Sequence, residues 1–233
     1  MTHWKGPGGD EPMEYYPISL DVSGKRCVVV GGGRVAVRKV ERLLDCGAEV
    51  VVVSRDLAPE LADWKSEGRI VHREAEYDAA SLDGAFLVIG ATDRDAVNAA
   101  VSRDARARGL LVNIVDEPAR CNFILPSLHR QGDLVITVST GGKSPALAKK
   151  LREELARLYG PEYGALADIL GALRERIRAR GRPVEENKAC FDAVVRSDIL
   201  DLIRRRDAGA VRERILRLTG EDLPVSFREG AEP

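Results

Sequence analysis

The chain has 233 residues, of which 36 are Lys or Arg and 37 are Asp or Glu, so its formal net charge is −1. This balance excludes the strong charge bias that favours nucleic acid or a membrane surface as the partner. Apolar residues make up 44% of the chain, but no apolar run reaches the roughly 18 residues that a membrane helix needs. We therefore expect a cytoplasmic globular protein with one large domain or two small ones.

The N-terminal segment is polar and rich in Gly and Pro over Met1–Pro12. It lacks the apolar core of a signal peptide, so we interpret residues 1–14 as a flexible leader. The four cysteines form no C-x-x-C pair and have no histidine at ligand spacing. We therefore expect no metal-binding residues.

Residues 26–114 alternate short apolar runs with helical stretches. The runs are β-branched and apolar on both faces, which is typical of parallel strands covered by helices. The expected strands are Arg26–Val30, Val50–Val53, Ile70–His72, Phe86–Ile89 and Leu111–Ile114. The expected helices are Val35–Cys46, Pro59–Glu67 and Asp95–Arg108. This alternation predicts an α/β fold with a Rossmann-type parallel sheet over residues 15–116.

The pattern changes after Asp116. Two extended segments, Cys121–Pro126 and Leu134–Thr140, are expected to be joined by the turn Arg130–Asp133. Ser144 is a predicted helix N-cap, and Pro145 takes the first helical position. Helices are then expected at 146–158, 162–180, 185–195 and 207–218. The sequence thus predicts a short β connector over 117–145 and a helical C-terminal domain over 146–233.

The segment Val30–Ala36 fits the pattern G-x-G-x-x-A directly after a strand and at the start of a helix. Gly31 permits the tight turn, Gly33 lets the backbone approach a pyrophosphate, and Ala36 lets the helix pack close to the sheet. The helix N-terminus adds free N–H groups and positive dipole. The pattern predicts a dinucleotide site, and the alternative is a tight turn without a ligand.

The acidic residue that holds the adenosine ribose in many such folds is not cleanly present. The second strand ends in Ser54-Arg55-Asp56. Asp56 could bind the ribose hydroxyls if the loop is slightly long, whereas Arg55 could receive a 2′-phosphate. This feature leaves NAD and NADP undecided.

Polar residues also follow the fourth and fifth strands. Ligands of an open parallel sheet bind beyond the carboxyl ends of its strands, so we expect Thr92 and Asp93 beside the cofactor. The alternative is that one of them only caps the helix that begins near Asp95. At the end of the fifth strand, Asp116 could take a proton while a hydride leaves to the cofactor, or it could be a turn residue.

The segment Ser139–Pro145 contains G-K-S but not the spacing of a P-loop. It is similar to an anion-binding turn at a helix start, and a plain strand-to-helix turn is an equal alternative. No tyrosine has the lysine spacing of Y-x-x-x-K, which disfavours a short-chain dehydrogenase.

Taken together, these segments resemble the precorrin-2 dehydrogenase family, the dehydrogenase and ferrochelatase part of siroheme synthase. The resemblance covers about residues 15–160, and its motifs occur in the order of the family. The matching segments are Tyr16–Ile18, Val30–Ala36, Arg38-Lys39, Ala91–Asp93, Val97-Asn98, Asn113–Asp116, Phe123–Ser127 and Ser139–Pro145.

The resemblance implies NAD-dependent oxidation of precorrin-2 to sirohydrochlorin, and some members then insert ferrous iron as a second substrate. Asp116 matches the catalytic aspartate of the family, and Thr140 falls where some members have a serine at the tetrapyrrole site. The implied cofactor residues are Gly31, Gly33, Arg34 and Val35, with Ser54, Arg55 and Asp56 near the adenosine. The implied tetrapyrrole contacts are Asn113, Ser139, Thr140, Gly141 and Lys143. The family also implies a homodimer through the β connector, residues 117–145, and the helical tail.

A tetrapyrrole with eight carboxylates is a polyanion, and basic residues gather around the connector. They are Arg120, Arg130, Lys143, Lys149, Lys150 and Arg152. Such residues suit a polyanionic ligand better than DNA. Two alternatives stay open: a non-enzymatic NAD-binding regulatory module, and a nucleic-acid binder through Arg204–Arg206. The second is disfavoured because Asp201 and Asp207 flank that run.

Overall fold

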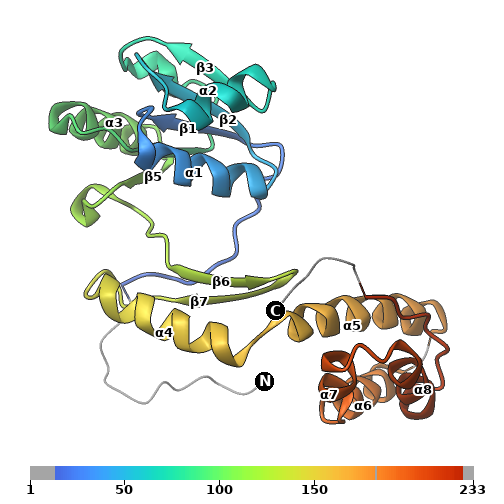
Figure 1. Cartoon of the computed structure of the whole chain (residues 1–233). Helices are drawn as coiled ribbons and strands as arrows, with labels where there is room; N and C mark the ends of the chain where they lie inside the picture. The colour runs from blue at the N-terminus through green and yellow to red at the C-terminus, as the bar shows by residue number, and fades with distance from the viewer. Residues whose placement is uncertain (1–13, 182, 228–233) are drawn as a thin grey trace. The chain divides into compact units, whose positions relative to one another are not determined.

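The computed structural model of the chain describes residues 14–181 and 183–227. The chain divides into two compact units, one ending at Leu125 and the other beginning at Pro126 (Figure 1). Of the predicted leader, residues 1–14, only Glu14 lies within the described residues. The division into residues 15–116, 117–145 and 146–233 stays a prediction.

The first unit contains a five-stranded parallel sheet with the order β3-β2-β1-β4-β5. Its strands are β1 (Arg26–Val30), β2 (Glu49–Ser54), β3 (Ile70–Glu74), β4 (Leu87–Gly90) and β5 (Leu111–Ile114). In the register of the central strands, Val28 lies opposite Val51 of β2 and Val88 of β4. The strand order reverses between β1 and β4, which is the topological switch point where such sheets bind ligands. The predicted Rossmann-type α/β fold is confirmed.

Helices cover both faces of this sheet (Figure 1). They are α1 (Arg34–Asp45), α2 (Pro59–Ser66) and α3 (Asp95–Ala107), with short 3₁₀ turns η1 (Ala79–Leu82) and η2 (Pro118–Arg120). Ala36 of α1 packs with Val29 on one face, and Val101 of α3 packs with Val28 on the other. Successive strand residues point to opposite faces, which is why the strands are apolar throughout. Full burial of each valine contributes about 1.5–3 kcal/mol.

The chain after β5 differs from the prediction of an extended segment at Cys121–Pro126. Cys121 and Asn122 follow η2 and hydrogen-bond to the free edge of β5 instead. The Asn122 side chain accepts a hydrogen bond from Val112 N at 2.7 Å, and Asn122 N donates to Val112 O at 3.0 Å. Ile114 N donates to the buried Cys121 thiol at 3.1 Å. The prediction was wrong because Asn122 and Cys121 bond to the backbone groups at the edge of β5, which a further strand would otherwise have paired.

The second unit begins with an antiparallel hairpin of β6 (Ser127–Gln131) and β7 (Leu134–Val138). Gly132 has φ +58° in the tight turn between them, so the predicted turn at Arg130–Asp133 began too early. The helices are α4 (Pro145–Leu158), α5 (Pro161–Ala179), α6 (Val184–Val195), α7 (Ile199–Arg204) and α8 (Ala208–Thr219). Helix α7 was not predicted. Leu173, Ile199 and Ile215 are fully buried in the core that α5–α8 share.

No helix in the described part of the chain is both long enough and apolar enough to cross a membrane.

Candidate dinucleotide site and catalytic aspartate

The turn between β1 and α1 is crowded at its first two glycines. Gly31 has φ +120° and donates from its N–H to Val53 O at 2.9 Å. A Cβ at Gly31 would collide with the carbonyl oxygen of Ala91, and one at Gly32 would collide with that of Asp56. The backbone of the turn is therefore held between the ends of β2 and β4, with no room for side chains.

Gly33 is different, because its surroundings are open. Among the described residues, no atom lies within 4 Å of the position that a Cβ would take. Gly33 is the N-cap of α1 (φ −87°), and no side chain caps the helix there. The first N–H groups of a helix lack partners within the helix and attract anions. This open, uncapped helix start has the form of a cradle for a pyrophosphate.

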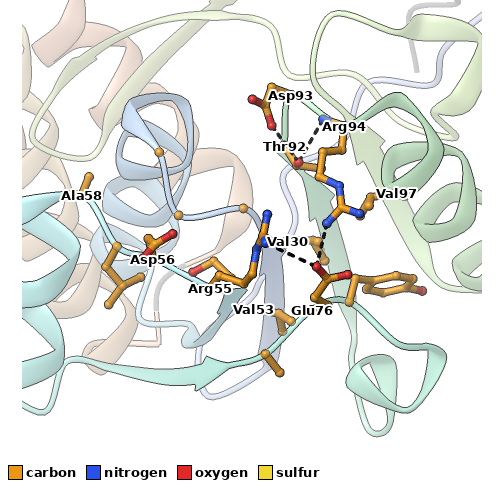
Figure 2. A pocket seen from close by; sticks show the side chains of 17 residues that line it. Val30, Val53, Arg55, Asp56, Ala58, Glu76, Thr92, Asp93, Arg94 and Val97 are labelled. Atoms are coloured by element: carbon orange, nitrogen blue, oxygen red, sulfur yellow. Dashed lines mark hydrogen bonds and ion pairs between the residues drawn. The ribbon is translucent and has the colours of Figure 1, made fainter.

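A cleft of about 350 Å³ surrounds the turn (Figure 2). It is lined by residues at the carboxyl ends of β1–β4 and at the start of α3. It brings together seven of the predicted cofactor residues: Gly31, Gly33, Ser54, Arg55, Asp56, Thr92 and Asp93. Arg34 and Val35 are the first two residues of α1, directly after the lining residue Gly33. Asn113 and Asp116 are not among the lining residues.

Ser54, at the end of β2, is held by His72 of β3. The His72 Nε2 atom lies 3.2 Å from Ser54 Oγ and 3.1 Å from Ser54 O. Lys65 Nζ lies 3.3 Å from His72 Nδ1. Because an ammonium group only donates, Nδ1 accepts and Nε2 carries the proton that is donated to Ser54. His72 therefore holds Ser54 in the wall of the cleft.

Glu76 and Arg94 line the cleft but were missed by the sequence reasoning. Figure 2 shows the Glu76 carboxylate between Arg55 and Arg94. The expected third strand ended at His72, whereas β3 continues to Glu74 and carries Glu76 to the carboxyl edge of the sheet. Arg94 directly follows Asp93, so the same strand-end argument could have included it.

The loop after β4 is shaped by its own side chains. Thr92 Oγ1 accepts a hydrogen bond from Arg94 N at 3.1 Å and donates to Asp93 Oδ1 at 3.4 Å. The buried Asn98 side chain donates to Thr92 O at 3.0 Å. The N-cap position of α3 is Arg94, without a side-chain cap, so neither Thr92 nor Asp93 caps the helix directly.

Asp116 is an exposed residue just beyond β5, with φ +61°. Aspartate is among the few residues other than glycine that adopt this left-handed conformation readily. Burial lowers the pKa of Lys39 on α1, with Arg42 and Arg38 lowering it further, and Asp116 acts in the opposite direction. The Asp116 carboxylate therefore lies near enough to the Lys39 ammonium to stabilise its charge.

Asn113 lies two residues before the loop of Asp116 and is buried. Its side-chain amide donates to Phe123 O at 3.1 Å. In the structure this amide holds the segment that leaves β5.

In the second unit, the Ser139–Pro145 turn satisfies its own polar groups. Gly141 and Gly142 have φ +60° and +81°. Ser139 Oγ accepts from Gly141 N at 3.2 Å, and Thr140 Oγ1 accepts from Ser144 N at 3.0 Å. Ser144 Oγ accepts from Leu147 N at 3.2 Å, which confirms the predicted N-cap of α4.

Four of the six predicted basic residues form ion pairs. In the first unit, Arg120 lies 2.7 Å from Asp95 and 2.6 Å from Glu117. The hydrogen bond from Arg120 lowers the pKa of Asp95. In the second unit, the pairs are Lys149–Glu153 (3.9 Å), Lys150–Glu154 (3.7 Å) and Arg152–Glu153 (3.0 Å). These cations are therefore shared with carboxylates of the chain.

Within residues 14–181 and 183–227, no group of three or more His, Cys, Asp or Glu is arranged to hold a metal ion.

Comparisons with known proteins agree with this geometry. Residues 18–127 match the family described as "Putative NAD(P)-binding", and residues 131–158 match "Sirohaem biosynthesis protein central". The solved structure "SirC, precorrin-2 dehydrogenase" has a similar fold, with a TM-score of 0.75, 24% identity, and coverage of 89% of this chain and 100% of that one. The siroheme synthase of Chromobacterium violaceum is 39% identical over 200 residues, which is 86% of this chain and 43% of that protein. Over most of its own length, the chain is similar to siroheme synthases.

Another relative is siroheme synthase 1 of Aeromonas salmonicida. It is 42% identical over 188 residues, which is 81% of this chain and 40% of that protein. The chain thus spans less than half the length of these curated relatives.

Proposed function

We propose that this chain is a cytoplasmic, NAD-dependent precorrin-2 dehydrogenase, which oxidises precorrin-2 to sirohydrochlorin in siroheme biosynthesis. One observation carries the proposal: a single unit presents an open, uncapped glycine turn after β1 and an exposed carboxylate, Asp116, after β5. Both features lie beyond carboxyl ends of the same parallel sheet, where such folds bind ligands.

The residues of the cleft fit NAD, which when bound accepts a hydride from the substrate and becomes NADH. Gly33 and the first N–H groups of α1, from Arg34 and Val35, hold the pyrophosphate. Ser54, Arg55 and Asp56 hold the adenosine, and Thr92 and Asp93 contact the cofactor from the loop after β4.

Asp116 is the proposed catalytic residue. The oxidation removes a hydride, which carries two electrons, from precorrin-2, and a proton must also leave. A carboxylate oxygen of Asp116 accepts that proton as the hydride departs. The exposure of Asp116 leaves its carboxylate open to a substrate, while Lys39 supplies a nearby positive charge.

The proposed tetrapyrrole contacts are Asn113 in the first unit and Ser139, Thr140, Gly141 and Lys143 in the second. Lys143 is exposed, and a lysine ammonium pairs with carboxylates of the macrocycle. Asn113 acts on the tetrapyrrole indirectly, because its buried side-chain amide holds the segment around Phe123 in place. Where ferrous iron is inserted into sirohydrochlorin, iron is a substrate, and the same open carboxylate accepts the displaced protons.

A second copy of this chain is the proposed protein partner. The hairpin β6–β7 turns one face with Leu128 and Val135 outward, at 38% and 48% exposure. Leu147 and Leu151 of α4 are also 47% and 37% exposed. A two-stranded sheet is marginal by itself, so apolar residues at these places call for a cover. Light scattering should give about twice the chain mass of 25.4 kDa, and a monomer mass at micromolar concentration would contradict the dimer.

The dehydrogenase activity is tested with precorrin-2 and NAD, by following sirohydrochlorin through its visible absorption. The wild-type chain should convert the substrate. Asp116→Asn should lower turnover by about 10²–10⁴-fold, the usual contribution of a positioned acid or base, and should bind NAD as the wild type does. Asp45→Asn is the matched control, because Asp45 is an exposed residue at the far end of α1.

Two results would overturn this proposal. Normal turnover by Asp116→Asn would move the proton acceptor to another residue. A folded wild-type chain that binds NAD but converts no precorrin-2 would leave the non-enzymatic regulatory module as the better description.

A further inference from the structure

The carboxylate of Glu76 forms ion pairs with two arginines, Arg55 and Arg94, that line the same cleft. Glu76 Oε1 lies 3.7 Å from Arg55 Nη1 and 3.2 Å from Arg94 Nη1 (Figure 2). Arg55 follows β2, Glu76 follows β3, and Arg94 lies between β4 and α3, so three strand ends meet at this group. All three residues line the cleft, and their side chains are 50–66% exposed.

Two guanidinium groups that share one anion are a strong receptor for phosphate. Arginine binds phosphate oxygens in a bidentate way that few other side chains can match. In dinucleotide folds, an arginine just after β2 accommodates the 2′-phosphate of NADP, and Arg55 has that position. With a second arginine beside it, this chain has the means to bind NADP.

Glu76 opposes that binding in two ways. It already occupies the guanidinium groups of Arg55 and Arg94, and its negative charge would lie beside an incoming phosphate. The 2′-phosphate of NADP would be repelled by the Glu76 carboxylate, because like charges placed side by side disfavour binding. The 2′-hydroxyl of NAD is uncharged, so it meets no such repulsion and can donate a hydrogen bond to the carboxylate. Arg55 and Arg94 thus form a receptor for phosphate, and Glu76 prevents phosphate from binding there.

We propose that Glu76 selects NAD over NADP by neutralising an arginine pair, Arg55 and Arg94, that would otherwise receive the 2′-phosphate. The inference rests on the proposed function only insofar as the cleft binds a dinucleotide. The Ser54-Arg55-Asp56 end of β2 alone left the choice between NAD and NADP undecided. The inference assigns this choice to Glu76, which follows the neighbouring strand β3.

The test measures the dissociation constants of NAD and NADP for the full chain by isothermal titration calorimetry. The wild type should bind NAD more tightly than NADP. Glu76→Gln, which keeps the shape and removes the charge, should tighten NADP binding by roughly five- to tenfold, a moderate gain because solvent screens these exposed groups. NAD binding should change by less than about twofold, since its ribose hydroxyl is uncharged and the Gln side-chain oxygen can still accept a hydrogen bond from it.

Three controls make the measurement specific. Glu74→Gln makes the same charge change two residues away, at an exposed position that does not line the cleft, and should leave the NAD to NADP ratio unchanged. Adding Arg94→Ala to Glu76→Gln should remove the gain in NADP binding. The gain should also shrink at high salt, as expected for an exposed charge effect.

The inference would be overturned if the ratio of the two dissociation constants, for NAD and for NADP, were the same in Glu76→Gln as in the wild type. A wild type that binds NADP more tightly than NAD would also overturn it. Parallel weakening of both cofactors by Glu76→Gln would assign Glu76 a purely structural role, and thermal melting would show it. Wild-type protein that binds neither dinucleotide would instead overturn the proposed function itself, so the two failures are distinguishable.

Discussion

Two strand-to-helix turns in this chain look alike in sequence but are built differently. In the β1–α1 turn, Gly31 is confined by the carbonyl oxygen of Ala91, while Gly33 opens onto free space. In the β7–α4 turn, Gly141 and Gly142 have positive φ, yet no described atom lies within 4 Å of a Cβ at either position. The first turn is fixed by its neighbours, whereas the second is held by its own residues, since Ser139 Oγ and Thr140 Oγ1 accept hydrogen bonds from Gly141 N and Ser144 N.

The two helix starts differ in the same way. Gly33 leaves α1 without a side-chain cap, whereas Ser144 caps α4 through Leu147 N. A phosphate at α1 would satisfy N–H groups that lack a partner, but at α4 it would compete with the Ser144 hydroxyl. Glycines before a helix therefore indicate an anion site only when the N-cap leaves the helix start open, which the sequence alone left undecided for Ser139–Pro145.

The largest expected effect on stability comes from Gly31→Ala. A Cβ would collide with the Ala91 carbonyl oxygen, at a φ of +120° that side chains rarely adopt. We expect a loss of about 2–4 kcal/mol in the free energy of unfolding, measured by urea denaturation. Gly141→Ala is the matched variant in the open turn and should lose only about 1–2 kcal/mol. Equal losses in the two variants would contradict the distinction between a crowded and an open turn.

An intermediate effect is expected from Ser144→Ala. Loss of the hydrogen bond to Leu147 N should lower the free energy of unfolding by about 1 kcal/mol. Ser144→Asp keeps an acceptor at the N-cap and should restore most of the stability. The same denaturation measurement applies, and an unchanged Ser144→Ala would show that α4 does not depend on this cap.

The smallest effect on stability is expected from Gly33→Ala, below about 1 kcal/mol, because nothing obstructs the new methyl group. The same methyl group would occupy the space that a pyrophosphate needs, so NAD affinity should fall by about tenfold or more. Calorimetric titration with NAD checks this. Unchanged affinity in a stable Gly33→Ala protein would mean that the open helix start is not the phosphate site.

Most of the first unit could be predicted because its strands are apolar on both faces. The prediction weakened at the edges of the sheet, where that pattern fades. Strand β3 was ended too early at His72 because Arg73 and Glu74 are exposed on the edge strand, and this error concealed Glu76. On the other edge, Asn122 and Cys121 replace a further strand by hydrogen bonds that no periodicity encodes.

In the second unit, α7 was missed for a different reason. It has six residues, too few for a helical pattern to stand out, and it is held by packing with α5 and α8. Similarly, the Glu76 link to Arg55 and Arg94 joins residues far apart in sequence, so only the strand order β3-β2-β1-β4 brings it about. The sequence shows the three charged residues, but it does not show that they lie close together in the fold.

The loop that carries Asp116 is fastened to the sheet on both sides. Val115 N donates to Gly90 O at 2.9 Å, and Asn122 is bound twice to Val112 beyond the loop. Tension arriving along the chain from Pro126 would thus be borne by Asn122 and Cys121 before it could reach Asp116. The loop of the proposed proton acceptor is therefore held by hydrogen bonds within the first unit.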